Sequence, residues 1–515
     1  MNIRNGIKTV LEKIRRICKR VVYKCDTIGE KIIRHINNIF FTKHIIISVK
    51  EVFCQNIGKG GFRRYDMIVR LLAVENYYGL NSCGMELYYR MQSRRNETIN
   101  AQSAVDRFRK LIESYDKDGY DPHSEIELGK DLCLIDGSHR MAMAMYHRCP
   151  TISAKVRNYS LDVYYSLEWF AANDFTKEEC EMMKSKYEEI AADYNQPFVC
   201  SLWHPAFPYF DEIERKLSLF GEVLESKTYS LNEYEYIYYT RGIYAVDDIE
   251  KWKIEKKVQH MVSSDTKEYH LRLILLLLSD PQFRLKQSTN GTLSAKCEKI
   301  KKIIRAVYKR RVENYYHDIV MHIGDNFFQN QFIYKLMNVP KIDLQQILVN
   351  LSEYEYVITK TDVDYMPQDF PVHYPLGKDI DIICNNMDNY DKVINSILQD
   401  VQSFKDIYDI RKVPKSPNRC QVRIELSGYP VFIFDVFSKI EFSKDNTTQE
   451  LCDNRVLKNG YYTPNEKGEI IARLCELKMH PEKKHHQKYI TDHKDNIDKD
   501  LCDKYLNFNW KKYVN

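Results

Sequence analysis

The chain has 515 residues, which is too long for one ordinary hydrophobic core and predicts roughly three or four domains. Its composition, 44% hydrophobic and 29% charged, is that of a globular protein and excludes a disordered chain. The formal net charge of +5 is small for this length and makes nucleic acid an unexpected partner, because nucleic-acid-binding domains usually gather more positive charge on one face.

The cysteines and the apolar segments indicate the compartment. The 14 cysteines are scattered, with no CxxC pair and no zinc-ligand spacing, as is typical of reduced cytoplasmic thiols. The strongest apolar run, Leu271 to Leu278, is less than half of the ~20 residues needed to cross a bilayer. The N-terminus lacks the apolar segment and cleavage site of a signal peptide. We therefore expect a cytoplasmic protein.

A basic amphipathic segment is predicted over residues 1–48. Hydrophobic residues recur at helical spacing between Ile3 and Val22, basic residues fill most of the other positions, and Glu12 is the only acid there. Two interpretations stay open. Residues 3–24 contact the inner face of an anionic membrane, where each basic residue contributes on the order of 1 kcal/mol, or the charged face is solvated while the helix packs on its own protein.

A mixed α/β unit is expected over residues 49–195. Its predicted strands are Ile126–Leu128, Leu132–Ile135 and Thr151–Val156, and its predicted helices are Arg64–Tyr78, Val105–Ser114 and Ser138–Tyr146. A tight turn, Asp136-Gly137-Ser138-His139-Arg140, joins the second strand to the last helix. The N–H groups of that helix's first turn form an anion site, to which Ser138, His139 and Arg140 add donors. A plain helix cap by Asp136 or Ser138 is the alternative.

This turn resembles the ParB/sulfiredoxin-like fold, in which an Asp-Gly-x-His-Arg turn contacts nucleotide phosphates. That fold includes a nucleotide-dependent free-serine kinase, CTP-binding chromosome-partitioning proteins and sulfiredoxins, whose reactive Cys is replaced here by Ser138. The resemblance implies that Asp136, Gly137, Ser138 and Arg140 bind nucleotide phosphates and that His139 is catalytic. The kinase's catalytic acid has three open candidates, Glu97, Glu125 and Glu127.

A middle α/β unit is expected over residues 196–345. Its predicted strands are Phe198–Leu202, Val223–Tyr229, Leu271–Leu278 and Asp318–Ile323, and its predicted helices are Tyr209–Phe220, Asp248–Met261 and Ser294–Tyr315. Strands that alternate with helices predict a largely parallel sheet covered on both faces. His322, Asp325 and Asn326 lie at the end of the last strand, the usual place for ligands, although a helix cap explains Asp325 and Asn326 equally well.

The last unit, residues 346–515, contains the strongest chemical signal. Its predicted strands are Tyr354–Thr359, Ile380–Cys384, Gln421–Leu426 and Val431–Phe437. Asp379 and Asp381 share one face of a strand, because side chains alternate with period two. Two carboxylates on one side suit Mg²⁺ or Mn²⁺, ions that also bind substrate phosphates. Asp435 is the candidate third ligand, because an acid within an apolar strand is costly unless it is paired or binds metal.

These residues resemble the nucleotidyltransferase superfamily, whose signature is Gly-Ser, then Asp-x-Asp on one strand and a further Asp on another. The strand at Tyr356, the Tyr374-Pro375 pair and the segment from Arg473 to Lys484 are similar to bacterial members linked to surface-polysaccharide genes. Lys378 stands where the family usually has Ser.

The resemblance implies a role for each of these positions. Gly377 and Lys378 would contact NTP phosphates, Asp379 and Asp381 would hold metal ions on those phosphates, and Asp435 would help to activate the acceptor.

The expected fold is thus a multidomain α/β and α+β protein, with a ParB/sulfiredoxin-like domain, a middle α/β domain and a nucleotidyltransferase-fold domain. The leading hypothesis is a Mg²⁺-dependent enzyme, possessing kinase and nucleotidyltransferase activities, that makes an activated precursor for surface-glycan biosynthesis. Its partners would be a nucleoside triphosphate and a small hydroxyl- or phosphate-bearing acceptor. Two alternatives stay open: a nucleotide-sensing or nucleic-acid-interacting protein with a degenerate transferase domain, and a glycan polyol-phosphate transferase.

Overall fold

A computed structural model describes residues 43–514, with gaps at Lys59, 96–99, Asp248, 263–265, 287–290 and Pro340. The predicted basic helix and its membrane contact through residues 3–24 lie outside the described residues, as does Glu97. Within the described ranges, none of the helices has both the length and the apolar character required to cross a bilayer.

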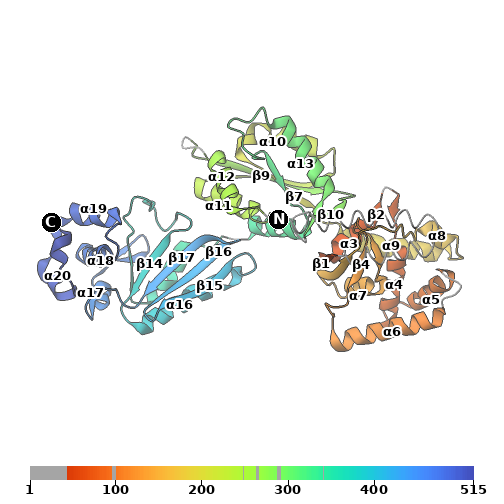
Figure 1. Cartoon of the computed structure of the whole chain (residues 1–515), viewed down its shortest axis with the longest axis horizontal. Coiled ribbons are helices and arrows are strands. Elements are labelled where there is room, and N and C mark those ends of the chain that lie inside the picture. The colour runs from red at the N-terminus through yellow and green to blue at the C-terminus, as the bar shows by residue number, and fades with distance from the viewer. Residues whose placement is uncertain are drawn as a thin grey trace, which may run out of the picture.

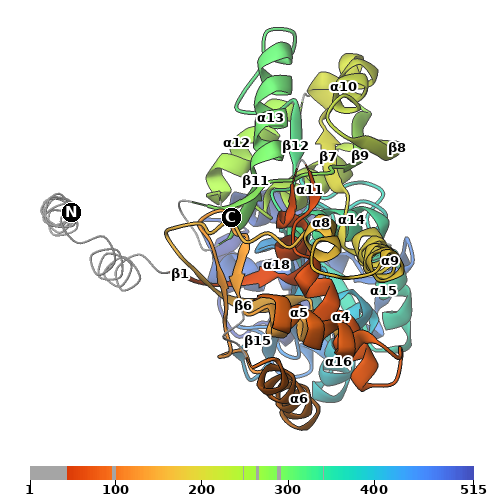
Figure 2. The same cartoon turned by 90° about the vertical axis from the view of Figure 1, so that its right-hand side faces the viewer.

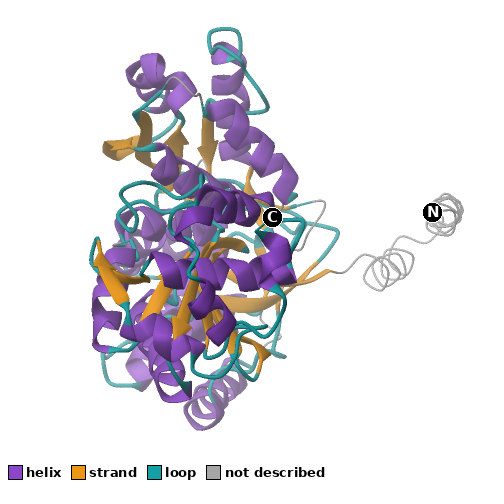
Figure 3. Ribbon diagram, turned by 90° about the vertical axis from the view of Figure 1, so that its left-hand side faces the viewer, coloured by secondary structure: helices purple, strands orange, loops and turns teal. Residues whose placement is uncertain are grey.

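Three larger sheets follow one another along the chain, and helices cover each of them (Figures 1 and 3). Two have four strands, in the orders β1-β6-β4-β5 and β12-β7-β9-β8, and the last has five strands, in the order β13-β14-β17-β16-β15. The protein is therefore an α/β and α+β protein with mixed and antiparallel sheets, which confirms the expected fold class at this level.

The first sheet is mixed. It consists of β1 (Lys43–Ser48), β4 (Ile126–Leu128), β5 (Leu134–Asp136) and β6 (Thr151–Val156), and only the β4–β6 pair is parallel. Its helices are α3 (Val49–Gln55), α4 (Tyr65–Tyr77), α5 (Gly84–Arg95), α6 (Ala101–Asp118), α7 (Ser138–Tyr146), α8 (Leu167–Ala171) and α9 (Lys177–Tyr194). The bounds of β4, β6 and α7 match those predicted from the sequence. Strand β1 comes from the segment assigned to the basic N-terminal region and pairs with β6.

The middle sheet is antiparallel throughout, so the expected parallel arrangement is wrong. Its strands are β7 (Phe198–Leu202), β8 (Glu222–Leu231), β9 (Tyr269–Leu277) and β12 (Met321–Ile323). Strands β7 and β8 run the same way, but β9 lies between them and pairs antiparallel with both. The alternation of strands and helices in the sequence does not reveal such an insertion, because it specifies neither which strands become neighbours nor their relative direction.

Helices and a hairpin complete the middle part of the chain. They are α10 (Phe210–Leu217), α11 (Glu233–Tyr244), α12 (Lys251–Met261), α13 (Ala295–Tyr308), α14 (Phe327–Asn338) and the hairpin of β10 (Phe283–Leu285) with β11 (Thr292–Ser294). Helix α13 ends at Tyr308, earlier than the predicted Tyr315.

The last sheet places β14 and β17 at its centre. Its strands are β13 (Tyr356–Thr359), β14 (Asp379–Cys384), β15 (Asp409–Ser416), β16 (Arg419–Leu426) and β17 (Tyr429–Phe437), and only β14 and β17 are parallel. The surrounding elements are α15 (Leu344–Asn350), α16 (Met387–Val401), α17 (Thr447–Asp453), β18 (Arg455–Lys458), β19 (Tyr461–Pro464), α18 (Glu466–Met479), α19 (Lys484–Asp492) and α20 (Lys499–Tyr505). Buried apolar residues dominate β13, β14 and β17, as expected for strands covered on both faces.

A buried carboxyl group links α3 to the middle part of the chain. Glu51 is 1% exposed, and its Oε2 accepts a hydrogen bond from the Thr292 hydroxyl at 2.7 Å. Its Oε1 accepts from the Phe327 N–H at 3.1 Å. Burial raises the pKa of Glu51 to about 7 from an ordinary value of 4.5, although both hydrogen bonds oppose that shift. The folded protein therefore holds this proton more tightly than the unfolded chain.

Replacing Glu51 by Gln should remove a pH-dependent loss of stability. The stabilisation linked to the raised pKa of Glu51 is fully present below pH 4.5 and is lost as the pH rises through about 7. From pH 5 to pH 8 the unfolding free energy of the wild type should fall by roughly 2–3 kcal/mol more than that of Glu51→Gln. Chemical unfolding at both pH values measures the difference. Glu113→Gln, at an exposed position of α6, is the control, and an equal pH response of Glu51→Gln and wild type would contradict the assignment.

Candidate active site

Three carboxylates predicted from the sequence lie together at the centre of the last sheet. Asp381 on β14 is directly opposite Asp435 on the parallel strand β17, and Asp379 precedes Asp381 on the same face. One oxygen from each of the three lies within 4.8 Å of the others. Asp379 is exposed, Asp381 is 8% exposed and Asp435 is fully buried.

The segment before β14 explains how Asp379 is positioned. Gly377 adopts a left-handed conformation with φ +81°, which glycine accepts without steric cost. The Tyr374 hydroxyl donates a hydrogen bond to the Lys378 carbonyl and closes this turn. Ile380 and Ile382 are buried in the core, so the alternation of the strand turns Asp379 and Asp381 to the other face.

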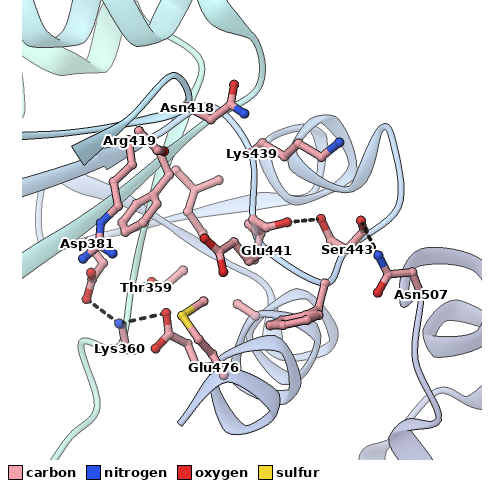
Figure 4. A pocket seen from close by; sticks show the side chains of 17 residues that line it. Thr359, Lys360, Asp381, Asn418, Arg419, Lys439, Glu441, Ser443, Glu476 and Asn507 are labelled. Carbon is pink, nitrogen blue, oxygen red and sulfur yellow. Dashed lines mark hydrogen bonds and ion pairs between the residues drawn. The ribbon is translucent and has the colours of Figure 1, made fainter. Parts of the chain in front are cut away.

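Lys360 neutralises one of the carboxylates. It follows β13, and its Nζ lies 2.7 Å from Asp381 Oδ2 and 3.5 Å from Glu476 Oε1 on α18 (Figure 4). Burial raises the pKa of Asp381 to about 6, against the opposing effect of Lys360. Burial by itself would lower the pKa of Lys360, but Asp381 and Glu476 reverse this and raise it above its ordinary value. We therefore take Lys360 as a cation that faces the carboxylate cluster.

Asp435 is held by two side chains of β16. Arg419 donates from Nε to Oδ1 at 3.0 Å and from Nη2 to Oδ2 at 2.7 Å. Gln421, opposite Asp435 in the strand register, donates from Nε2 to Oδ2 at 2.9 Å. Such partners are what a fully buried carboxylate requires, because an unpaired one would cost several kcal/mol.

The donor set of these three residues fits a hard divalent cation. Carboxylate oxygens are the ligands that Mg²⁺ and Mn²⁺ prefer. Each carboxylate oxygen has two lone pairs, so the ion pairs to Lys360 and Arg419 do not exhaust the acceptor capacity of Asp381 and Asp435. The exposed Asp379 makes no ion pair within the part of the chain that the structure describes. These three residues are thus the ones that could hold such an ion.

A pocket of about 210 Å³ opens beside Asp381 (Figure 4). Its cations are Lys360, Arg419 and Lys439, its acids besides Asp381 are Glu441 and Glu476, and its apolar wall includes Ile383, Phe437, Phe442 and Met479. The side chains come from β13, β14, the β15–β16 turn, the segment after β17, and α18. The pocket therefore offers a small site next to the carboxylates, in which cations and acids are equal in number.

Gly377 and Lys378 lie at the exposed edge of this cluster. The Lys378 Nζ lies 4.8 Å from the centroid of the Tyr365 ring. The described residues give Lys378 no ion-pair partner, so its ammonium group remains available to an anionic ligand. This position is compatible with the phosphate contact that the sequence resemblance implies for Lys378.

The Asp136–Arg140 turn lies in the first sheet, away from the carboxylate cluster (Figure 1). Gly137 has φ +92°, and a Cβ placed there would lie 2.8 Å from Ile126 Cγ2, so this turn requires glycine. Asp136 ends β5 and is exposed, and α7 begins at Ser138. The order of strand, turn and helix is the one predicted from the sequence.

The polar side chains of this turn are largely engaged with the protein itself. The Ser138 hydroxyl accepts a hydrogen bond from Arg64 Nη2 at 2.8 Å. His139 Nε2 lies 2.6 Å from the Tyr88 hydroxyl. Burial, together with the nearby Arg70 and Arg95, holds the pKa of His139 well below its ordinary range, so this imidazole is neutral near pH 7.

Arg140 differs from its neighbours in this turn. It is half-buried and makes neither a hydrogen bond nor an ion pair with any described residue. Arg140 is therefore the member of the turn that is most available to a phosphate group.

Sequence reasoning did not single out Lys360, Arg419, Gln421 or Glu476 as site residues. Lys360 is separated from Asp381 by a loop, and Glu476 comes from a distant helix, so no local spacing connects them. Arg419 and Gln421 lie on the strand before that of Asp435. In Arg419–Leu426 polar residues alternate with apolar ones, and this pattern could have indicated that Arg419 and Gln421 share one face of the strand. Only the strand pairing shows what these side chains contact.

Comparison of the chain with protein-family models, with curated proteins and with solved structures gave no match. The relationships that the two motifs suggest therefore stay predictions.

Proposed function

We propose that this chain is an enzyme that transfers a nucleotidyl or phosphoryl group from a nucleoside triphosphate to a small acceptor. The observation that supports this best is the approach of Asp379, Asp381 and Asp435 to within 4.8 Å of one another beside a pocket. These residues would hold Mg²⁺ or Mn²⁺, which polarises phosphoryl oxygens and neutralises the charge that develops during transfer. In this proposal residues 346–515 form a nucleotidyltransferase fold.

The surrounding side chains supply binding and orientation in this proposal. Gly377 and Lys378 contact the triphosphate at the exposed edge of the cluster. The 210 Å³ pocket takes the acceptor, and Arg419 and Lys439 suit an acceptor that carries a phosphate group. Asp435 would help to activate the acceptor as a ligand of the divalent ion, while Lys360 remains protonated and stabilises negative charge.

Residues 49–195 would contribute a second phosphate site in a ParB/sulfiredoxin-like fold. The first turn of α7 and the free guanidinium of Arg140 support it. A kinase at this turn, with His139 as a catalytic group, and a nucleotidyltransferase at the carboxylates would together convert an alcohol into an activated donor for surface-glycan synthesis. Such an enzyme would work in the cytoplasm, at the inner face of the membrane if residues 3–24 bind lipid.

A nucleotide-sensing protein is the competing proposal. It is favoured by the ion pairs that Lys360 and Arg419 already make with Asp381 and Asp435, and by Lys378 in the position of the usual Ser. In that case nucleotide would bind without being consumed, and the carboxylate cluster would be a degenerate site.

The test is a product assay on the purified full chain with Mg²⁺, each of the four NTPs and a panel of phosphosugars and sugar alcohols. We expect pyrophosphate release with one NTP and one acceptor class, abolished by EDTA. Release of CMP from a nucleotide-activated polyol would instead indicate polyol-phosphate transfer. Binding of nucleotide without consumption under all conditions would support the sensing protein and contradict the enzyme.

A further inference from the structure

A larger pocket, distinct from the carboxylate site, lies in the middle part of the chain. It has a volume of about 560 Å³ and is bordered by α12, α13 and the end of β12. Figure 1 places α12 and α13 in a different part of the molecule from β14 and β17, and Figure 2 shows β12 beside α13. A neighbouring pocket of about 570 Å³ runs along α13 and shares Glu298, Lys301, Arg305 and Asp318 with the first. The two pockets therefore adjoin one another, and together we call them the α13 pocket.

The outer part of the α13 pocket is strongly basic. It is lined by six cations, Arg284, Lys299, Lys301, Lys302, Arg305 and Lys309, and by two carboxylates, Glu298 and Asp318. Lys299, Lys302 and Arg305 recur every three residues and Lys301 lies four before Arg305, which places these side chains along one side of α13, and Lys309 directly follows the helix. Arg305 pairs with Asp318, and Lys301 pairs with Glu298 and Asp325.

Three lysines of this face have no carboxylate partner among the described residues. Lys299, Lys302 and Lys309 are exposed, and the described part of the chain gives none of them an ion-pair partner. Like charges gathered on one face of a pocket attract an anion and are costly to hold together without one.

The inner end of the α13 pocket contains buried polar atoms that the protein does not satisfy. His322 is 1% exposed and lines the pocket, with its Nδ1 3.5 Å from Asp247 Oδ2. Its Nε2, like Oδ1 of Asp247, is buried and has no hydrogen-bond partner among the described residues. A buried polar group without a hydrogen-bond partner destabilises the fold, so two at one pocket indicate a ligand that pairs with them.

The charge state of these groups suits a neutral hydrogen-bonding partner. Burial, reinforced by Lys301 and Arg305, holds the pKa of His322 well below its ordinary range, so its imidazole is neutral. Burial and the nearby Asp325 raise the pKa of Asp247 to about 7. A neutral imidazole and a carboxyl group that is partly protonated near pH 7 bind hydroxyl or amide groups more readily than a phosphate. The phosphate would lie among the outer cations.

Aromatic side chains border the same pocket. Trp252 is 56% exposed although it lines the site, and Tyr316 stacks on His260 at 4.2 Å between ring centroids. An exposed indole beside a cationic surface suits the ring of a sugar or a nucleobase.

We propose that the α13 pocket binds an organic phosphate, with its phosphate on the cations of α13 and its organic part toward Trp252 and His322. The ligand class follows from three independent features at one site: lysines without an ion-pair partner among the described residues, unsatisfied buried polar atoms and an exposed aromatic ring. This proposal does not depend on the proposed transfer reaction, because it uses none of the residues of the carboxylate cluster.

The test measures Trp252 fluorescence of the full chain in EDTA, which removes the divalent ions that the carboxylate cluster would need. The probes are the four NTPs, a hexose 1-phosphate and inorganic phosphate, and Trp252→Phe reports the signal of the other tryptophans. We expect saturable quenching by at least one ester, absent in Trp252→Phe. Absence of saturable quenching with every ester, or equal binding of inorganic phosphate and the esters, would overturn the proposal.

Charge variants separate this site from other phosphate sites. Lys299→Gln/Lys302→Gln/Lys309→Gln replaces exposed residues only, so it should fold, and it should weaken binding of the ester at least tenfold. The matched control, Lys110→Gln/Lys177→Gln/Lys184→Gln, removes the same charge from exposed positions of α6 and α9 and should bind as the wild type does. Equal affinities of the two triple variants would contradict the assignment. His322→Gln changes a residue at the inner end of the pocket. It should lower the affinity for the ester more than the affinity for inorganic phosphate.

Discussion

Replacing Asp381 by Asn is expected to lower the rate of nucleotide transfer by about a thousandfold. The change removes a negative charge from the centre of the cluster, where Asp381 lies opposite Asp435 and beside Lys360. A divalent ion bound by carboxylates contributes several kcal/mol to stabilising the charge of the transition state, and about 4 kcal/mol corresponds to a thousandfold change in rate. The measurement is the initial rate of pyrophosphate release at saturating NTP and Mg²⁺.

Asp388→Asn is the matched control for this prediction. Asp388 is exposed in the first turn of α16, close to Asp381 in the sequence, and among the described residues it pairs only with Lys392 at the surface. Its replacement should change the rate less than twofold. Thermal unfolding separates a catalytic effect from a structural one: Mg²⁺ with NTP should raise the melting temperature of wild type and of Asp388→Asn, but not of Asp381→Asn. A rate for Asp381→Asn within threefold of wild type would exclude the carboxylates as the reactive site.

Replacing Asp66 by Asn is expected to lower the unfolding free energy of the part of the chain that contains the first sheet by roughly 3–5 kcal/mol. This is the usual cost of removing one partner of a buried ion pair. Asp66 is fully buried between two buried arginines. Its Oδ1 accepts from Arg64 Nε at 2.7 Å and its Oδ2 accepts from Arg70 Nη1 at 2.9 Å. Burial would raise the pKa of Asp66, but the two arginines hold it well below its ordinary range. Asparagine would leave both guanidinium groups without a counter-charge.

The effect should spread to the Asp136–Arg140 turn. Arg64 also donates hydrogen bonds to the Leu134 carbonyl on β5 and to the Ser138 hydroxyl at the start of α7. It therefore connects Asp66 to the two elements that this turn joins. Hydrogen exchange is the suitable measurement, because a chain with several sheets need not unfold in one step. We expect the amides of residues 134–146 to lose protection in Asp66→Asn, whereas those of β14 and β17 keep theirs. Asp106→Asn, on the exposed face of α6, should leave both segments unchanged, and unchanged protection at 134–146 in Asp66→Asn would contradict the predicted coupling.

Local patterns in the sequence were enough to locate much of the secondary structure and one half of the candidate site. The bounds of β4, β6 and α7 follow from alternating or helical hydrophobic spacing, which depends only on neighbouring residues. The common face of Asp379 and Asp381 follows from the period of a strand in the same way. The left-handed backbone of Gly137 is also local in origin, whereas the close approach of Ile126 to this glycine is not.

Tertiary structure alone decided which distant groups meet. The register that places Asp435 opposite Asp381, the ion pair of Lys360 with Glu476, and the insertion of β9 between β7 and β8 all join segments far apart in the chain. Hydrophobic periodicity states that a strand is buried but not which strand lies beside it or in which direction. That choice depends on how all of the apolar faces are buried at once, a property of the whole packed chain rather than of any one segment.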